Sequence, residues 1–129
     1  MYHIILAGGR GTRFWPLSTE KKPKQFLDII DETSLIKSTY NRLCKISSHK
    51  NIFIITSEKY IKIVSEEIKD IPKKNIIIEP SPKSTAPAIY LATNYIKEID
   101  KDAKIGVYPS DHFIKGEKQF SDRKRYFFW

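Results

Sequence analysis

Short runs of apolar, largely β-branched residues alternate with segments of helical periodicity along most of this chain. The apolar runs lie at residues 2–6, 52–56, 76–79 and 105–108, and the helical patterns lie at 35–44, 60–71 and 89–99. Runs that are apolar nearly throughout are typical of parallel strands covered on both faces. Because crossovers between parallel strands are right-handed, this order predicts an α/β fold: a Rossmann-like, doubly wound, mostly parallel sheet within a three-layer α/β/α arrangement.

Two loops follow strands that are expected to end at the same edge of this sheet, where open α/β sheets bind ligands. One spans residues 7–27 and contains Gly8, Gly9 and Gly11; the other is the segment PSDH at 109–112. Glycines let backbone amides approach an anion closely, so the first loop predicts phosphate binding. The dinucleotide fingerprint fails because Phe14 occupies its third glycine position, and the P-loop pattern fails as well.

Composition excludes several classes of protein. The net charge of +8 comes from lysines scattered over helices and loops, which favours a solvated surface over a nucleic-acid-binding stripe. No apolar run approaches the ~18 residues of a membrane span, and the N-terminus lacks the basic region of a signal peptide, so we expect a cytoplasmic protein without membrane contact. Cys44, the single cysteine, stands at an apolar helical position and is expected to pack in the core.

Four ordered motifs resemble one enzyme family, the sugar-nucleotide pyrophosphorylases. They are LAGGRGTRFWPLS, PKQFL, EPSPKSTAPAI and PSDH. Trp15 and Gln25-Phe26 resemble the branch of bacterial mannose-1-phosphate guanylyltransferases rather than the thymidylyl- and uridylyl-transferases. The resemblance implies that residues 1–120 form a truncated, N-terminal nucleotide-binding half of a nucleotidyltransferase domain. Residues 121–129, with their abrupt basic and aromatic composition, are expected to form a divergent tail.

This resemblance implies transfer of GMP from GTP to mannose 1-phosphate, with Arg13 and Lys24 as catalytic cations and Asp111 as a ligand of the cofactor Mg²⁺. Cationic side chains and a hard metal ion suit a reaction that mainly positions and neutralises phosphate charge. The resemblance implies nucleotide binding by Leu6, Ala7, Gly8, Gly9, Gly11, Thr12, Glu79, Ser84, Thr85 and Ala86.

Several alternatives stay open. Thr85 is also expected to cap the third helix, with Pro87 in its first turn, and a turn-forming role is the alternative for Asp111. Ordinary surface charges are the alternative for Arg13 and Lys24. The chain could instead be a non-catalytic nucleotide-binding module, a thymidylyl- or uridylyl-transferase for another sugar 1-phosphate, or a basic polyanion-binding protein. Self-association into a homo-oligomer is left open, and we expect little turnover from these 129 residues alone.

Overall fold

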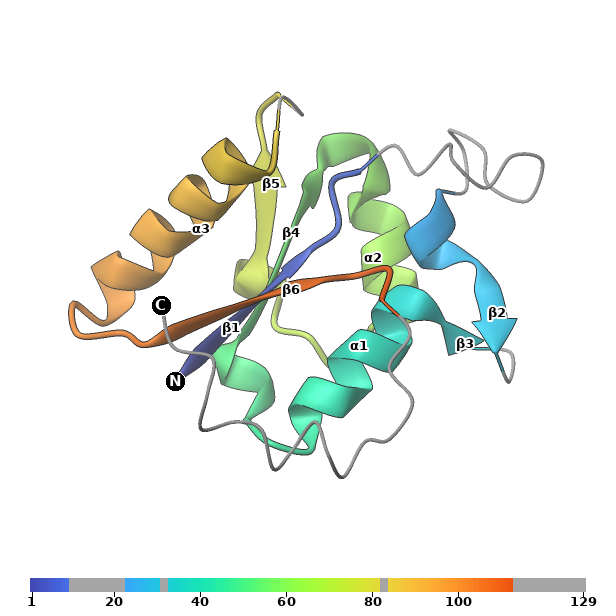
Figure 1. Cartoon of the computed structure of the whole chain (residues 1–129), viewed down its shortest axis with the longest axis horizontal. Helices are drawn as coiled ribbons and strands as arrows, with labels where there is room; N and C mark the ends of the chain where they lie inside the picture. The colour runs from blue at the N-terminus through green and yellow to red at the C-terminus, as the bar shows by residue number, and fades with distance from the viewer. Residues whose placement is uncertain (10–22, 31–32, 82–83, 113–129) are drawn as a thin grey trace.

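A four-stranded parallel sheet forms the centre of the molecule (Figure 1). The computed structural model describes residues 1–9, 23–30, 33–81 and 84–112. The sheet has the order β5-β4-β1-β6, and its strands are β1 (Tyr2–Leu6), β4 (Ile52–Ser57), β5 (Ile76–Glu79) and β6 (Ile105–Pro109). Every neighbouring pair is parallel. The predicted strands and fold class are therefore confirmed, with β4 and β6 one residue longer than expected.

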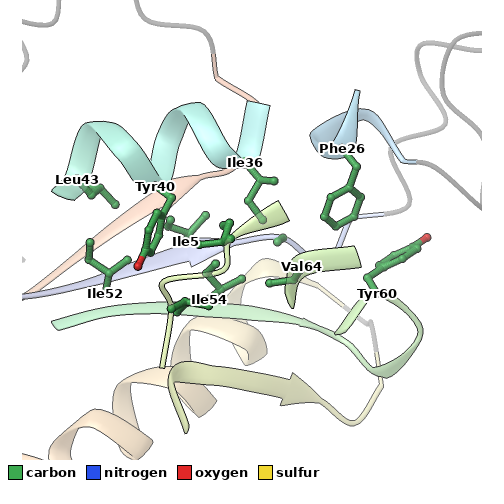
Figure 2. Packing of buried hydrophobic residues seen from close by; sticks show 12 residues of the cluster. Ile5, Phe26, Ile36, Tyr40, Leu43, Ile52, Ile54, Tyr60 and Val64 are labelled. Carbon is green, nitrogen blue, oxygen red and sulfur yellow. The ribbon is translucent and has the colours of Figure 1, made fainter. Parts of the chain in front are cut away.

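Helices cover both faces of this sheet, which gives the three predicted layers. In Figure 1, α3 (Thr85–Ile99) lies on one side, and α1 (Leu35–Cys44) and α2 (Ile61–Glu67) lie on the other. Alternate residues of β4 divide between the layers. Ile52 and Ile54 belong to the cluster beneath α1 and α2 (Figure 2), whereas Phe53 and Ile55 pack with α3. All six residues of β4 are buried, which explains the apolar run of its first four residues, Ile52 to Ile55.

Two helix boundaries differ from the sequence-based expectation. The helical pattern predicted a segment reaching residue 71, but α2 ends at Glu67. Ile68 and Ile71 are nevertheless buried, because the chain turns and returns both to the same core. Pro72 disfavours helical geometry at Ile71, the residue before it, so the helix was not favoured to reach residue 71.

At the start of α3, Thr85 is the first helical residue rather than its cap. The cap position belongs to Ser84, whose side chain makes no capping hydrogen bond, and Pro87 lies in the first turn as predicted. The sequence analysis also missed a small antiparallel pair, β2 (Asp28–Ile30) with β3 (Thr33–Ser34). Four 3-10 turns were missed too: η2 (Lys24–Phe26), η3 (His49–Asn51), η4 (Glu58–Tyr60) and η5 (Lys73–Asn75).

Cys44 packs against the core under α1, as predicted, and is half-buried. Its Sγ lies 3.5 Å from Nδ1 of His49, which is also 2.8 Å from the Tyr40 hydroxyl. Burial raises the pKa of the Cys44 thiol, although the hydrogen bond with Tyr40 opposes this shift. None of the helices in the described ranges has the length and apolar character needed to cross a membrane. The proposed tail at 121–129 lies outside the described residues.

Candidate functional site

The carboxyl ends of the parallel strands converge at one edge of the sheet. The chain runs from β1 to β4 and β5 on one side, and then returns to β6 on the other side of β1. This reversal creates a switch point between β1 and β6, the position at which open α/β sheets bind ligands. Two backbone hydrogen bonds hold the strand ends together there: Ala7 N to Ile55 O at 2.8 Å and Ser110 N to Leu6 O at 3.2 Å.

The start of the glycine loop, Ala7–Gly9, lies at this switch point and is fixed by neighbouring side chains. The Ala7 carbonyl accepts hydrogen bonds from Gln25 Nε2 at 3.0 Å and from Thr56 Oγ1 at 3.1 Å. Gln25 Nε2 also donates to the Gly9 carbonyl at 3.1 Å. These bonds fix the backbone before any ligand binds, which reduces the ordering cost of binding.

The two described glycines of this loop have different surroundings. A Cβ atom added to Gly8 would lie 2.7 Å from the Glu79 Oε2 atom, so only glycine allows this carboxylate to approach so closely. A Cβ added to Gly9 would meet no atom of the described residues within 4 Å, so this position faces open space within the described part of the chain. Gly8 therefore serves the packing of Glu79, and Gly9 leaves room for a ligand. Gly11, Thr12 and Arg13, which the sequence analysis also predicted here, lie outside the described residues.

Lys24 and Asp111 meet at the same edge, although they are far apart in the sequence. Their Nζ and Oδ2 atoms are 3.3 Å apart, and the two side chains are 22% and 40% exposed. Both remain accessible to an anion or a cation from solvent. The ion pair therefore joins one of the two predicted catalytic cations to the predicted metal carboxylate.

The EPSPKSTAPAI segment divides into two parts. Glu79 ends β5 and is buried against Gly8, so the structure brings this predicted residue to the glycine loop. Ser84, Thr85 and Ala86 are exposed at the N-terminus of α3. Unpaired amides at a helix start favour anionic or polar ligands. The alternative role of Thr85 as the helix cap is wrong, because Ser84 occupies the cap position.

Sequence analysis missed two polar residues that shape the loop, Gln25 and Thr56. Gln25 was noted only as a mark of one family branch, and its donation to two backbone carbonyls has no periodic signal. Thr56 could have been noticed as the polar residue that interrupts the apolar run of β4. Both side chains are buried.

The donor set at this edge fits a magnesium ion that is shared with phosphate oxygens. Asp111 supplies one accessible carboxylate, and Mg²⁺ commonly combines one or two carboxylates with phosphate and water ligands. Within the described ranges, no group of three or more His, Cys, Asp or Glu side chains could hold a metal ion by itself. A dedicated all-protein metal cage is therefore not formed by this part of the chain.

Comparisons with known proteins agree on one family. The model of the nucleotidyl transferase family matches residues 2–124. A mannose-1-phosphate guanylyltransferase of Escherichia coli is 40% identical over 121 residues, covering 91% of this chain and 26% of that protein. The xanthan biosynthesis protein XanB of Xanthomonas campestris is 38% identical over 119 residues, covering 91% and 25%.

Two solved structures share the fold of this chain. A structure described as mannose-1-phosphate geranyltransferase from Thermus thermophilus superposes with a TM-score of 0.81 at 26% identity, covering 94% of this chain and 35% of that one. A mannose-6-phosphate isomerase from Helicobacter pylori superposes with a TM-score of 0.72 at 30% identity, covering 94% and 42%. The chain spans about a quarter of the length of the curated relatives that it matches.

Proposed function

The chain belongs to the nucleotidyl transferase family, and we propose that it forms the nucleotide-binding part of an enzyme that transfers GMP from GTP to mannose 1-phosphate, giving GDP-mannose and pyrophosphate. The observation that carries this proposal is the meeting of the glycine loop, Lys24 and Asp111 at the switch point of the sheet. The names of its relatives support the choice of guanosine nucleotide and mannose phosphate.

The proposed reaction requires mainly that the enzyme position the two phosphate groups and neutralise their charge. An oxygen of the sugar phosphate attacks the α-phosphorus in line, and pyrophosphate leaves from the opposite side. Proximity and preorganised charges account for most of the catalysis in such transfers. Residues that hold the triphosphate in one orientation therefore do the main work of this part of the enzyme.

The predicted site residues have separate roles in this proposal. The open space at Gly9 admits a phosphate group close to the backbone, and the Lys24 ammonium, a compact charge, binds a phosphate oxygen. Arg13 is proposed to bind the leaving pyrophosphate through its planar fork. Asp111 would hold Mg²⁺, which when bound supplies charge neutralisation for the phosphate oxygens. Glu79, Ser84, Thr85 and Ala86 are proposed to contact the nucleoside.

We place the sugar phosphate outside the described part of the site, because these residues supply cations and backbone for the triphosphate only. We expect this chain to bind GTP with Mg²⁺ and to release little pyrophosphate when mannose 1-phosphate is added. A cytoplasmic location accords with a substrate such as GTP, and homo-oligomer formation stays an open proposal.

Calorimetric titration tests the proposal directly. GTP, ATP, dTTP and UTP are each titrated with and without Mg²⁺, with the Lys24→Ala variant as the control for specific binding. GTP should bind most tightly, and Mg²⁺ should strengthen its binding. Tighter binding of dTTP would favour a thymidylyltransferase, and binding of RNA in place of every nucleotide would favour the polyanion alternative.

A further inference from the structure

The short helix η2 sends its three side chains in three directions. A 3-10 helix has three residues per turn, so consecutive side chains point about 120° apart. Lys24 contacts Asp111, Gln25 contacts the glycine loop, and Phe26 enters the core. Phe26 is fully buried, and its ring lies 5.7 Å from that of Tyr60 (Figure 2). The core therefore anchors the backbone that carries Lys24 and Gln25.

The side-chain amide of Gln25 bridges the two residues on either side of Gly8. Its Nε2 atom donates to the carbonyls of Ala7 and Gly9, at 3.0 and 3.1 Å, and the side chain is buried. Both partners are carbonyl oxygens, which only accept, so the amide must present its NH₂ group to them. A group with a single donor, or with none, cannot make both bonds.

We infer that Gln25 is a positioning residue of the proposed triphosphate site: it holds the glycine loop in a fixed place relative to Lys24. This inference rests on the proposed function, because it concerns the same site. Gln25 and Lys24 are adjacent in η2, so the two amide bonds fix the separation between the loop backbone and the Lys24 backbone. Without them, the loop and the cation could not be held against one phosphate group with the same precision.

The chain offers a matched control at the opposite end of the sheet. Asn75 is also a buried amide, and its Nδ2 lies 3.3, 3.0 and 2.8 Å from the carbonyl oxygens of His49, Lys50 and Ile52. These groups lie at the amino ends of β4 and β5, away from the switch point. Asn75 therefore resembles Gln25 in burial and bonding but is distant from the proposed ligand.

The test compares Gln25→Met with Asn75→Leu in the full chain. Both variants lose buried hydrogen bonds, so both should have a lower denaturant midpoint. Only Gln25→Met should weaken the binding of GTP with Mg²⁺, by about tenfold, because only it releases the glycine loop. Unchanged affinity in Gln25→Met, or an equal loss in Asn75→Leu, would overturn the inference.

Hydrogen exchange gives a second measurement that needs no nucleotide. The Ala7 amide, which donates to the Ile55 carbonyl at 2.8 Å, should exchange at least tenfold faster in Gln25→Met than in the wild type, and at the wild-type rate in Asn75→Leu. Equal exchange in all three proteins overturns the inference. A wild-type chain that binds no nucleotide while this amide responds to Gln25→Met would refute the proposed function but retain the role of Gln25 in holding the loop. If Gln25→Met fails to fold, Gln25→Asn, which keeps an amide but withdraws it by one methylene, takes its place.

Discussion

Replacing Gly8 with alanine should lower the free energy of unfolding, whereas the same change at Gly9 should raise it slightly. The new Cβ at position 8 would lie 2.7 Å from Glu79 Oε2, and the carboxylate would have to retreat by about 0.7 Å to reach the 3.4 Å at which ordinary contact begins. Glu79 is only 8% exposed, so there is little open space into which it can move.

The magnitude follows from two effects. Overpacking against a buried side chain, here that of Glu79, costs about 1–3 kcal/mol. Exchange of glycine for alanine also stabilises by about 0.4–1 kcal/mol, because it restricts the unfolded chain, and neither glycine has the positive φ that would oppose alanine. This second effect applies at both positions and cancels in the comparison. The free energy of unfolding of Gly8→Ala should therefore lie about 1–3 kcal/mol below that of Gly9→Ala.

Urea denaturation followed by far-UV circular dichroism measures both values, provided that the m-values agree. A double-mutant cycle identifies the cause, because among the described residues the atoms within 4 Å of the added Cβ at Gly8 belong to Glu79. In a Glu79→Ala background, Gly8→Ala should have the same effect as Gly9→Ala. Equal stability of the two single variants, or a cost at Gly8 that persists without the Glu79 side chain, would refute the reasoning.

Other changes test the site and the core. Lys24→Ala should weaken GTP binding by roughly 1.5–3 kcal/mol, the range for charged hydrogen bonds, with an unchanged urea midpoint; equal affinity by calorimetry would contradict its role. Asp111→Asn should abolish the strengthening of GTP binding by Mg²⁺, and a retained Mg²⁺ effect in the same titration would remove Asp111 from the metal site. Phe26→Ala should lower the free energy of unfolding by about 3–5 kcal/mol in urea, since the ring is fully buried. Burial raises the pKa values of Cys44 and Tyr40 in the folded state. The unfolded chain therefore loses these protons first, and the free energy of unfolding should fall as pH rises above about 8.5. Cys44→Ala should remove the first part of this fall, and an identical pH profile for wild type and variant would be the contrary result.

The sequence predicted the sheet well because strands covered on both faces are apolar along most of their length. In β4 the run from Ile52 to Ile55 is apolar, and the buried Thr56 and Ser57 end the strand. The hairpin of β2 and β3 escaped prediction because strands of three and two residues are too short to show a period. The predicted end of α2 was wrong because Ile68 and Ile71 continue the helical spacing of apolar residues. Both pack into the core, but they lie in a turn after the helix. The spacing of apolar residues indicates which residues are buried, but a buried residue need not lie in a helix.

The site was predictable to a similar degree. The ends of parallel strands must meet at one edge, so the glycine loop and Asp111 could be placed together from their positions after β1 and β6. The approach of Lys24 to Asp111 depends on η2, whose formation no sequence pattern indicated. The amide bonds of Gln25 depend on burial of a polar side chain, which hydrophobic spacing cannot reveal.

The central place of β1 has a consequence for synthesis of the chain on the ribosome. β1 is made first, but its two neighbours, β4 and β6, follow about 50 and 100 residues later. At about 5–20 residues per second, β6 is completed roughly 5–20 s after β1. During this interval one side of β1 lacks its partner strand and can pair with other chains, which creates a demand for protection by chaperones. Because Asp111 follows β6, the proposed anion site is the last feature of the described fold to assemble.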